Sequence, residues 1–298
     1  MLRTIPGPGK IWILDRWDEY FYKYSYDLRH KYLTHYAIWI PQDLALNKKA
    51  GQLMVTYPLF HYVELIDSQS GVLINAIQDL RYPFACVYHA RQNTFWLTDS
   101  TGYLYRFKAN NLQDKELIDD ALNKPVTLVT DAFGNVYLLD TGLNQIIVYE
   151  ASGARINKIS DYGKLTFLTV DATGHYVHFI SKQADSSRIY LYSPLTHKTR
   201  LLYSALNIDV VRQSPLDQTL WLVQNNASDA RILQLSDQGV RLKSLSGYKK
   251  IEDLAVNPYN GNIVIADRKL HQVCHLTFSG QLIGTIDDAP FPFRILIE

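Results

Sequence analysis

Long apolar runs are missing from this sequence. A helix needs about 20 consecutive apolar residues to cross a bilayer, and because no such run occurs in the chain, we expect no membrane-spanning helix. An excess of charge is missing too, since 30 basic side chains face 29 acidic ones and the formal net charge is +1. This balance implies no general electrostatic affinity for nucleic acid or for an anionic membrane.

A secretory signal is not recognisable at the start of the chain. The opening residues MLRTIPGPGK lack the apolar segment that such a signal carries. We therefore expect either a cytoplasmic protein or a mature exported chain whose signal has been replaced by a start methionine.

Cysteine is scarce, and the two copies are Cys86 and Cys274. The repeat described below places them on strands of well-separated repeat units, whereas a disulfide requires Cα atoms within about 7 Å. We therefore expect two buried thiols.

Catalytic motifs are also missing. The sequence contains no H-E-x-x-H or C-x-x-C motif, no G-x-S-x-G nucleophile turn and no phosphate-binding loop. The nine histidines are scattered, without a spacing that would bring them to one metal ion. We therefore predict no catalytic residue, no metal ligand and no cofactor, and we favour a protein that is not an enzyme.

The sequence does have a repeat. Seven short apolar strands end at a turn-capping or polar residue, at intervals of 42, 42, 41, 41, 43 and 43 residues. The strands are IWILD, LMVTY, FWLTD, VYLLD, VHFIS, LWLVQ and IVIAD, which end at Asp15, Tyr57, Asp99, Asp140, Ser181, Gln224 and Asp267. A period in this range, with several strands in each repeat, is typical of a β-propeller.

Each repeat is predicted to form one four-stranded blade, with strands A to D in chain order. The strands given above are strand B. Strand A precedes them, as in TLVTD (127–131), and strands C and D follow, as in QIIVYE (145–150) and GARINKI (153–159). Strands A and B are apolar on both faces, which suits a sheet packed between two neighbouring sheets.

The two ends of the repeat array predict how the ring closes. Residues 9–36 contain strands B, C and D without a strand A, and the segment FRILI (293–297) matches a strand A that no strand B follows. We therefore predict a single domain over residues 1–298, an all-β, seven-bladed propeller in which the C-terminal strand completes blade 1. A six-bladed ring is the alternative, and it would leave one repeat outside the ring.

Two repeats resemble a known family. GNVYLLDTGLNQIIVYEASG (134–153) and DLAVNPYNGNIVIADRKLHQVCHLTFSG (253–280) are similar to NHL repeats, with a Gly turn, an apolar strand ending in Asp, and a further strand ending near a second Gly. The resemblance to this NHL/YVTN-like group implies a propeller that binds proteins, nucleic acids or small ligands, and it implies no single activity. NHL propellers often have six blades, so a count of seven departs from the commoner pattern.

The aspartates that end strand B recur at one position of the repeat, as in Asp99, Asp140 and Asp267. Such recurrence indicates a structural role, because a functional site would break the pattern. We expect each carboxylate to accept backbone N–H groups in the B–C turn of its own blade. Replacement by alanine is then expected to cost about 1 kcal/mol, with binding unaltered.

The first position of strand A is predicted to line the mouth of the central tunnel. In the consecutive blades 6, 7, 1 and 2 this position holds Asp209, Asp253, Arg294 and Asp43. Three carboxylates are suitable ligands for a hard cation, but a guanidinium group among them competes with the metal. We favour an ion-pair network in which Arg294 satisfies two carboxylates and holds the C-terminal strand, and a cation site is the alternative.

The D–A and B–C connections emerge on the same side as this mouth, and we call that side the loop face. Basic and aromatic residues gather there, and we predict a binding surface formed by Arg16, Trp17, Arg81, Tyr82, Tyr248, Lys249, Arg268 and Lys269. Since the whole chain is nearly neutral, this local excess is not a by-product of composition. Aromatic residues and arginine are enriched where interfaces derive their binding energy.

Two classes of function stay open. We favour a non-catalytic binding or scaffold propeller that contacts a protein partner, as a subunit of a larger assembly, with a small anionic ligand as a further candidate. Neither nucleic acid nor membrane insertion is expected. The alternative is a propeller hydrolase or lyase with a site on the axis. The family resemblance favours an extracytoplasmic location if a signal was removed, and the location is otherwise cytoplasmic.

Overall fold

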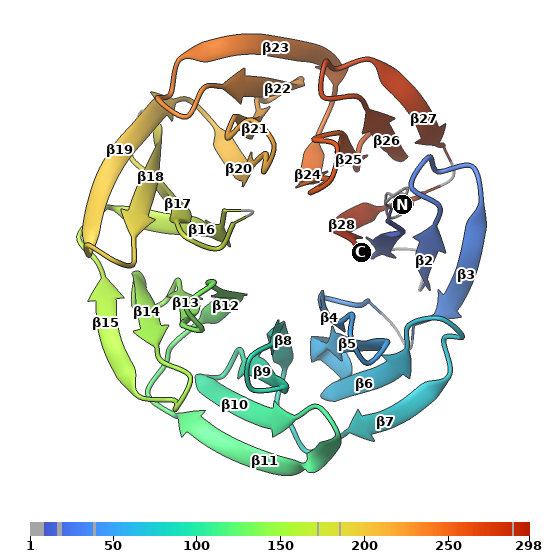
Figure 1. Ribbon diagram of the computed structural model, residues 1–298, viewed down its shortest axis with the longest axis vertical. Coiled ribbons are helices and arrows are strands. Elements are labelled where there is room, and N and C mark those ends of the chain that lie inside the picture. Colours follow the sequence, from blue (N-terminus) through green and yellow to red (C-terminus); the bar gives the residue numbers. More distant parts are fainter. Residues whose placement is uncertain (1–8, 17–19, 38–39, 172, 185, 288) are drawn as a thin grey trace, which may run out of the picture. The chain divides into compact units, whose positions relative to one another are not determined.

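The chain is an all-β, seven-bladed β-propeller. The computed structural model describes residues 9–16, 20–37, 40–171, 173–184, 186–287 and 289–298, which form seven antiparallel four-stranded sheets (Figure 1). Besides strands, this part of the chain contains one 3-10 turn, η1 (Pro58–Phe60), and no helix long and apolar enough to cross a membrane. The six-bladed alternative is wrong, because every repeat forms a sheet of its own.

Two compact units make up the chain, and unit 2 spans Ile38–Val211. It holds blades 2 to 5. Blade 2 consists of β4 (Asp43–Asn47), β5 (Gln52–Tyr57), β6 (Tyr62–Asp67) and β7 (Leu73–Ile77), and blade 3 of β8 (Pro83–His89), β9 (Thr94–Asp99), β10 (Tyr103–Lys108) and β11 (Asn111–Asp119). Blade 4 consists of β12 (Pro125–Thr130), β13 (Val136–Asp140), β14 (Gln145–Tyr149) and β15 (Arg155–Ile159), and blade 5 of β16 (Lys164–Val170), β17 (Val177–Lys182), β18 (Ser187–Ser193) and β19 (Lys198–Ala205).

Unit 1 comprises Met1–Ala37 and Arg212–Glu298. It holds blades 7 and 1 and most of blade 6, whose first strand crosses the unit boundary. Blade 6 consists of β20 (Ile208–Gln213), β21 (Leu220–Asn225), β22 (Ala230–Leu235) and β23 (Arg241–Tyr248). Blade 7 consists of β24 (Ile251–Val256), β25 (Ile263–Asp267), β26 (Gln272–Leu276) and β27 (Leu282–Ile286), and blade 1 of β28 (Pro292–Ile297), β1 (Ile11–Asp15), β2 (Tyr20–Tyr24) and β3 (Lys31–Tyr36).

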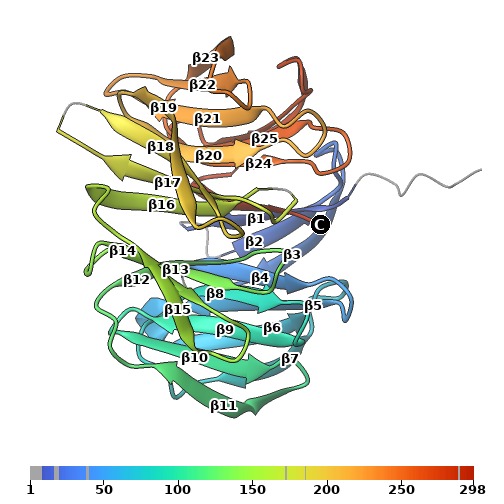
Figure 2. The same cartoon turned by 60° about the vertical axis from the view of Figure 1, so that its left-hand side comes forward.

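Blade 1 is completed by the C-terminal strand, as predicted. β28 pairs antiparallel with β1, with Ile13 opposite Ile295, and Figures 1 and 2 show the C-terminal end of the chain beside β1. A buried ion pair reinforces the blade, because the Lys23 ammonium of β2 lies 3.0 Å from the Glu298 carboxylate. The two ends of the repeat array therefore share one sheet.

Side chains of facing sheets form the core of each unit. Strand B is buried along its whole length in blades 1, 3, 4 and 7, as expected for a sheet covered on both faces. In unit 2, Trp96 of β9 and Tyr149 of β14 belong to one cluster, with ring centroids 6.3 Å apart. In unit 1, Tyr22 and Tyr24 pack against β25 and β26. Each large apolar side chain buried in this way contributes about 1.5–3 kcal/mol.

Both cysteines lie buried as thiols, as predicted, with Cys86 in β8 and Cys274 in β26. Burial raises the pKa of the Cys274 thiol to about 11, with smaller contributions from Asp267 and Asp287. The reactive thiolate form of this residue is therefore scarce at neutral pH.

His178 of β17 leads to a prediction about acid stability. Its side chain is fully buried, and burial lowers its pKa from 6.5 to about 4, although Asp171 opposes this shift and Arg200 adds to it. Between these values the unfolded chain takes up the proton before the folded one does. The contribution of neutral His178 to the free energy of unfolding is therefore fully present above about pH 6.5. It is lost as the pH falls to 4, which lowers the free energy of unfolding by roughly 3 kcal/mol.

We expect the variant His178→Leu, which cannot titrate at this position, to have a melting temperature that depends less on pH between 6.5 and 4 than that of the parent protein. Circular dichroism melts at intervals of half a pH unit measure the two slopes. Equal slopes in the two proteins would show that protonation of His178 does not contribute to acid unfolding.

Candidate functional site

The buried aspartates that end strand B organise the loop face. The Asp140 carboxylate accepts four backbone N–H groups, those of Asn123 (2.8 Å), Lys124 (3.0 Å), Gly142 (2.9 Å) and Leu143 (2.9 Å). Asp267 accepts four in the same way, from Lys249, Lys250, Lys269 and Leu270. The predicted structural role is confirmed. Each of these carboxylates ties a D–A connection to a B–C connection, which is more than the single turn that the sequence predicted.

Two equivalent loop positions of unit 1 carry arginines. Arg16 follows β1 and Arg268 follows β25, so the repeat places both side chains on the loop face. Arg16 Cζ lies 3.3 Å from the centre of the Phe293 ring, and Arg268 Cζ lies 4.9 Å from the centre of the Phe291 ring. Such contacts fix the orientation of a guanidinium group, because they use its flat face and not its N–H edge.

Two acidic residues of β24 neutralise part of this charge. Arg268 Nε lies 2.9 Å from Glu252 Oε1, which makes an ion pair. Asp253 Oδ1 accepts a hydrogen bond of 3.0 Å from Arg212 Nη2 of β20, and its other oxygen accepts the Ile295 N–H of β28 at 3.1 Å. Asp253 therefore joins the inner strands of three blades and positions Arg212 at the same time.

Arg294 of β28 adds a fourth guanidinium group, and its charge acts on both Arg16 and Arg212. Burial lowers the pKa of Arg16 to about 10, with Glu252 opposing the shift and Arg294 and Arg268 adding to it. Burial also lowers the pKa of Arg212, against the effect of Asp253. An added anion would relieve this mutual repulsion.

We call Arg16, Arg212, Arg268 and Arg294 the arginine cluster. It gathers four guanidinium groups in unit 1, beside the carboxylates of Glu252 and Asp253. The carboxylates Asp15 and Asp267 beneath it are buried and accept backbone N–H groups of the loops, among them that of Phe291 at 2.8 Å from Asp15. The arrangement is chemically suited to binding acidic groups.

The loop face of unit 2 carries a pocket beside Arg81 and Tyr82. It has a volume of about 560 Å³ and is also lined by His61, Gln78, Asp79 and Leu80. The Tyr82 backbone N–H donates to His61 Nδ1 at 3.2 Å, and the two rings meet edge to face with centroids 4.5 Å apart. The structure thus brings together two residues of the predicted binding surface, Arg81 and Tyr82, around one hollow.

The other predicted loop-face residues belong to unit 1. Tyr248 ends β23 and is half-buried, whereas the Lys249 and Lys269 side chains are exposed in the two loops that Asp267 ties together. Burial raises the pKa of Tyr248 to about 12, so its hydroxyl group stays protonated at neutral pH. Trp17 lies outside the residues that the structure describes.

The three predicted tunnel-mouth carboxylates each have a partner within their own unit. In unit 2, Asp43 Oδ2 accepts the backbone N–H of Cys86 in the next blade at 3.1 Å, and Asp209 forms an ion pair of 2.7 Å with Lys182. Asp253 of unit 1 plays the same part as Asp43, because its Oδ2 accepts the backbone N–H of Ile295 in the next blade. Among the described residues, no three His, Cys, Asp or Glu side chains are grouped as metal ligands. The four-residue network and the cation site both stay predictions.

Sequence reasoning missed four residues of this site, namely Arg212, Glu252, Phe291 and Phe293. A signal for the aromatic pair was present, because an aromatic–Pro–aromatic tripeptide spans the start of strand A in blade 1 (291–293) and again in blade 3 (82–84). The same tripeptide supplies Tyr82 to the pocket of unit 2. It therefore marks both aromatic parts of the loop face.

Fold and site together define a seven-bladed β-propeller with a basic and aromatic loop face. No protein-family model matches the chain, and no curated protein is significantly similar to it in sequence. A structure of a protein from Lactobacillus plantarum is 12% identical, covers 98% of this chain and 99% of its own, and has a TM-score of 0.77. A functionally unknown protein from Desulfotomaculum acetoxidans DSM 771 is 12% identical, with coverages of 97% and 98% and a TM-score of 0.75. Hydrazine synthase from Kuenenia stuttgartiensis is 12% identical, with coverages of 80% and 77% and a TM-score of 0.66. At this identity the likeness shows the fold alone.

Proposed function

We propose that this chain is a non-catalytic binding propeller, and that it holds an acidic surface of a protein partner on the loop face of blades 7 and 1. The observation that carries the proposal is the arginine cluster, which gathers four guanidinium groups in one unit of a chain whose whole net charge is +1. Arginine and aromatic side chains supply most of the binding energy at protein interfaces.

The cluster is organised before any partner arrives. Phe291 and Phe293 support two of the guanidinium groups from beneath, and Asp253 holds Arg212. Side chains that are already ordered and partly desolvated lose less entropy and less hydration on binding than mobile surface lysines do. An incoming carboxylate would form bidentate hydrogen bonds with such groups.

The NHL kind of propeller is part of the proposal. In the quoted repeats, β13 ends at Asp140 and β25 ends at Asp267, and each aspartate is followed by a tight turn and a buried strand C. Members of that group use a propeller as a platform for binding, which agrees with a loop face whose aspartates are committed to structure and whose arginines remain for recognition.

We expect the double variant Arg268→Ala, Lys269→Ala to bind acidic polypeptide at least fivefold more weakly than the parent protein. The cause is the loss of two positive charges, one of which belongs to the arginine cluster. Poly-L-glutamate serves as the probe, in fluorescence anisotropy titrations at 50 and 500 mM NaCl. Binding that depends on exposed charges should weaken with salt, because the Debye length falls from roughly 14 Å to about 4 Å.

The matched control is Lys48→Ala, Lys49→Ala, which removes the same charge from the exposed A–B turn of blade 2. Arg91 in the next A–B turn is unsuitable for this purpose, because its guanidinium group donates to the Phe133 carbonyl at 2.8 Å and so links two blades. A control variant that loses more affinity than the loop-face variant would refute the assignment, both for poly-L-glutamate and for partners captured from the native organism.

A further inference from the structure

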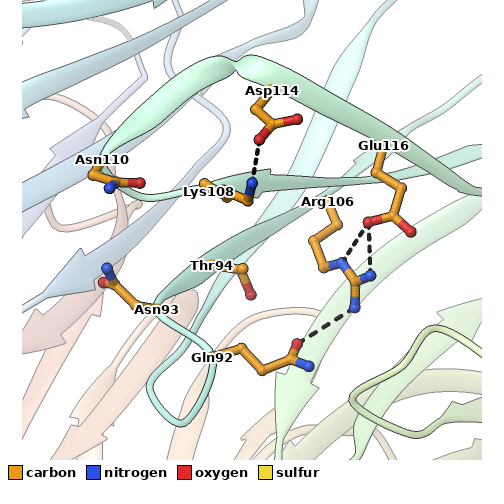
Figure 3. Close-up of a pocket in the computed structure, with 8 residues that line it drawn as sticks. All are labelled: Gln92, Asn93, Thr94, Arg106, Lys108, Asn110, Asp114 and Glu116. Carbon is orange, nitrogen blue, oxygen red and sulfur yellow. Dashed lines mark hydrogen bonds and ion pairs between the residues drawn. The ribbon is translucent and has the colours of Figure 1, made fainter.

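A second hollow lies on the opposite side of blade 3, where the A–B and C–D turns emerge. It has a volume of about 450 Å³, and all eight residues that line it have polar side chains (Figure 3). Three of them are amides, namely Gln92 and Asn93 of the A–B turn and Asn110 of the C–D turn. Most ligand pockets of this volume are lined mainly by apolar residues. A lining made of polar residues, whose carbon stems also contribute to the surface, indicates a ligand with many polar groups and some apolar surface.

The charged residues of this pocket balance each other. Arg106 donates to Glu116 Oε2 from Nε at 2.9 Å and from Nη2 at 2.6 Å, and Lys108 Nζ lies 2.5 Å from Asp114 Oδ2 (Figure 3). Two cations and two carboxylates leave no net charge. The pocket therefore has no electrostatic preference for an anion or a cation, and it presents donors and acceptors in similar numbers.

Thr94 supplies an independent observation. It begins β9, is 7% exposed and lines the pocket, and its hydroxyl group has no hydrogen-bond partner among the residues that the structure describes. A buried hydroxyl group without a partner is unfavourable, because it has lost its hydrogen bonds to water. Buried polar groups nearly always have a partner, whether protein, water or ligand.

The same position of blade 6 shows what the fold normally does with this hydroxyl group. Thr219 is 8% exposed, donates to Asp217 at 2.8 Å and accepts from Gln234 at 3.1 Å. Gln234 is paired with Trp221 across the sheet, as Arg106 is paired with Trp96 in blade 3.

Blade 3 departs from blade 6 at both partner positions. Gln92 stands in place of the aspartate and forms no hydrogen bond with the Thr94 hydroxyl group. Arg106 stands in place of the glutamine. Arg106 turns instead to Glu116, to Gln92 Oε1 at 3.4 Å and to the Ala151 carbonyl. The Thr94 hydroxyl group is thereby left facing the hollow.

We propose that this pocket binds a neutral polyhydroxylated ligand of monosaccharide size. Hydroxyl groups both donate and accept, so they match the amides, the Thr94 hydroxyl group and the two ion pairs at once. Planar guanidinium, carboxylate and amide groups can each contact two neighbouring hydroxyl groups of such a ring. This site lies in unit 2 and shares no residue with the arginine cluster, which lies in unit 1.

The test uses D-glucose, D-galactose, D-mannose, N-acetyl-D-glucosamine and myo-inositol as probes, with sodium phosphate and glycine as charged comparisons. Binding is followed by saturation-transfer NMR and by titration calorimetry of the full chain. We expect at least one neutral probe to bind and neither charged one to compete with it. Thr94→Val should weaken that binding at least fivefold without lowering the melting temperature, because the hydroxyl group that it removes has no partner in the fold.

Two further variants make the result specific. Thr219→Val in blade 6 removes an equivalent hydroxyl group and should leave binding unchanged. Arg106→Gln restores one of the two partner positions of blade 6, that of Gln234, and should weaken binding by giving Thr94 an internal partner. Three outcomes would overturn the proposal: no neutral probe binds, phosphate or glycine binds with the same dependence on Thr94, or Thr94→Val and Arg106→Gln both bind as the parent protein does.

Discussion

Removal of residues 291–298 is expected to lower the melting temperature by about 10 °C or more and to broaden the transition. Blade 1 would lose β28, and Lys23 would lose its ion-pair partner Glu298 inside the sheet. Breaking a buried ion pair alone costs about 3–5 kcal/mol, and each kcal/mol lowers the melting temperature of a protein of this size by roughly 2–4 °C. Circular dichroism melts, together with binding of a hydrophobic dye to exposed core residues, measure both effects.

Complementation separates closure by this strand from a general effect of truncation. A synthetic peptide of residues 290–298, added in excess, should restore the melting temperature in a concentration-dependent way. The same peptide carrying Ile295→Asp should fail, since Ile295 is buried in the core of unit 1. A truncated protein that melts within a degree or two of the intact chain would show that β28 does not close the blade.

Replacement of Asp140 by alanine is expected to cost about 3 kcal/mol, more than the roughly 1 kcal/mol predicted from the sequence alone. Four backbone N–H groups would lose their acceptor, and each buried donor left without a partner costs about 1–3 kcal/mol unless the loops relax toward water. Urea unfolding followed by tryptophan fluorescence measures the loss. The slope of the unfolding curve should stay constant, because the extent of folded structure does not change.

The pattern of bonds predicts a ranking among variants. Oδ1 of Asp140 accepts from Lys124, Gly142 and Leu143, so Asp140→Asn keeps an acceptor where most of the donors lie and should cost less than Asp140→Ala. Asp99 accepts the backbone N–H of Thr101 at 2.7 Å and its hydroxyl group at 2.5 Å. We expect the stability lost on replacement to increase with the number of N–H groups that the carboxylate accepts. Equal losses of stability for Asp140→Ala and Asp99→Ala would contradict this.

The blade architecture was predictable because the same strand pattern recurs seven times in the sequence. Each strand B segment recurs at the predicted place, from β1 (Ile11–Asp15) to β25 (Ile263–Asp267), and its two apolar faces indicated burial between sheets. The closing strand could be found because a strand A without a strand B has only one blade left to join. What the repeat could not predict is which side chains of different blades meet, since this depends on rotamers and on the tilt of each sheet.

The candidate site was predictable only in part for that reason. The positions of Arg16 and Arg268 follow from the repeat, but the pairing of Asp253 with Arg212 links strands that lie 41 positions apart in the sequence. The pocket at Thr94 was not foreseeable from its own residues. The reason why Thr94 lacks a partner emerges only when blade 3 is compared with blade 6, where Asp217 and Gln234 bind the equivalent hydroxyl group.

The sharing of blade 1 between distant segments also affects how the protein is made. Ile13 pairs with Ile295, 282 positions later in the chain. At a synthesis rate of about 5–20 residues per second, the apolar strand IWILD waits for its partner for roughly 15–55 s after it leaves the ribosome. Throughout that interval its inner edge is unpaired and can accept the equivalent strand of a neighbouring nascent chain, which is the route to an exchanged dimer. The yield of correctly closed protein should therefore depend on how long β1 stays unpaired during synthesis as well as on the stability of the finished propeller.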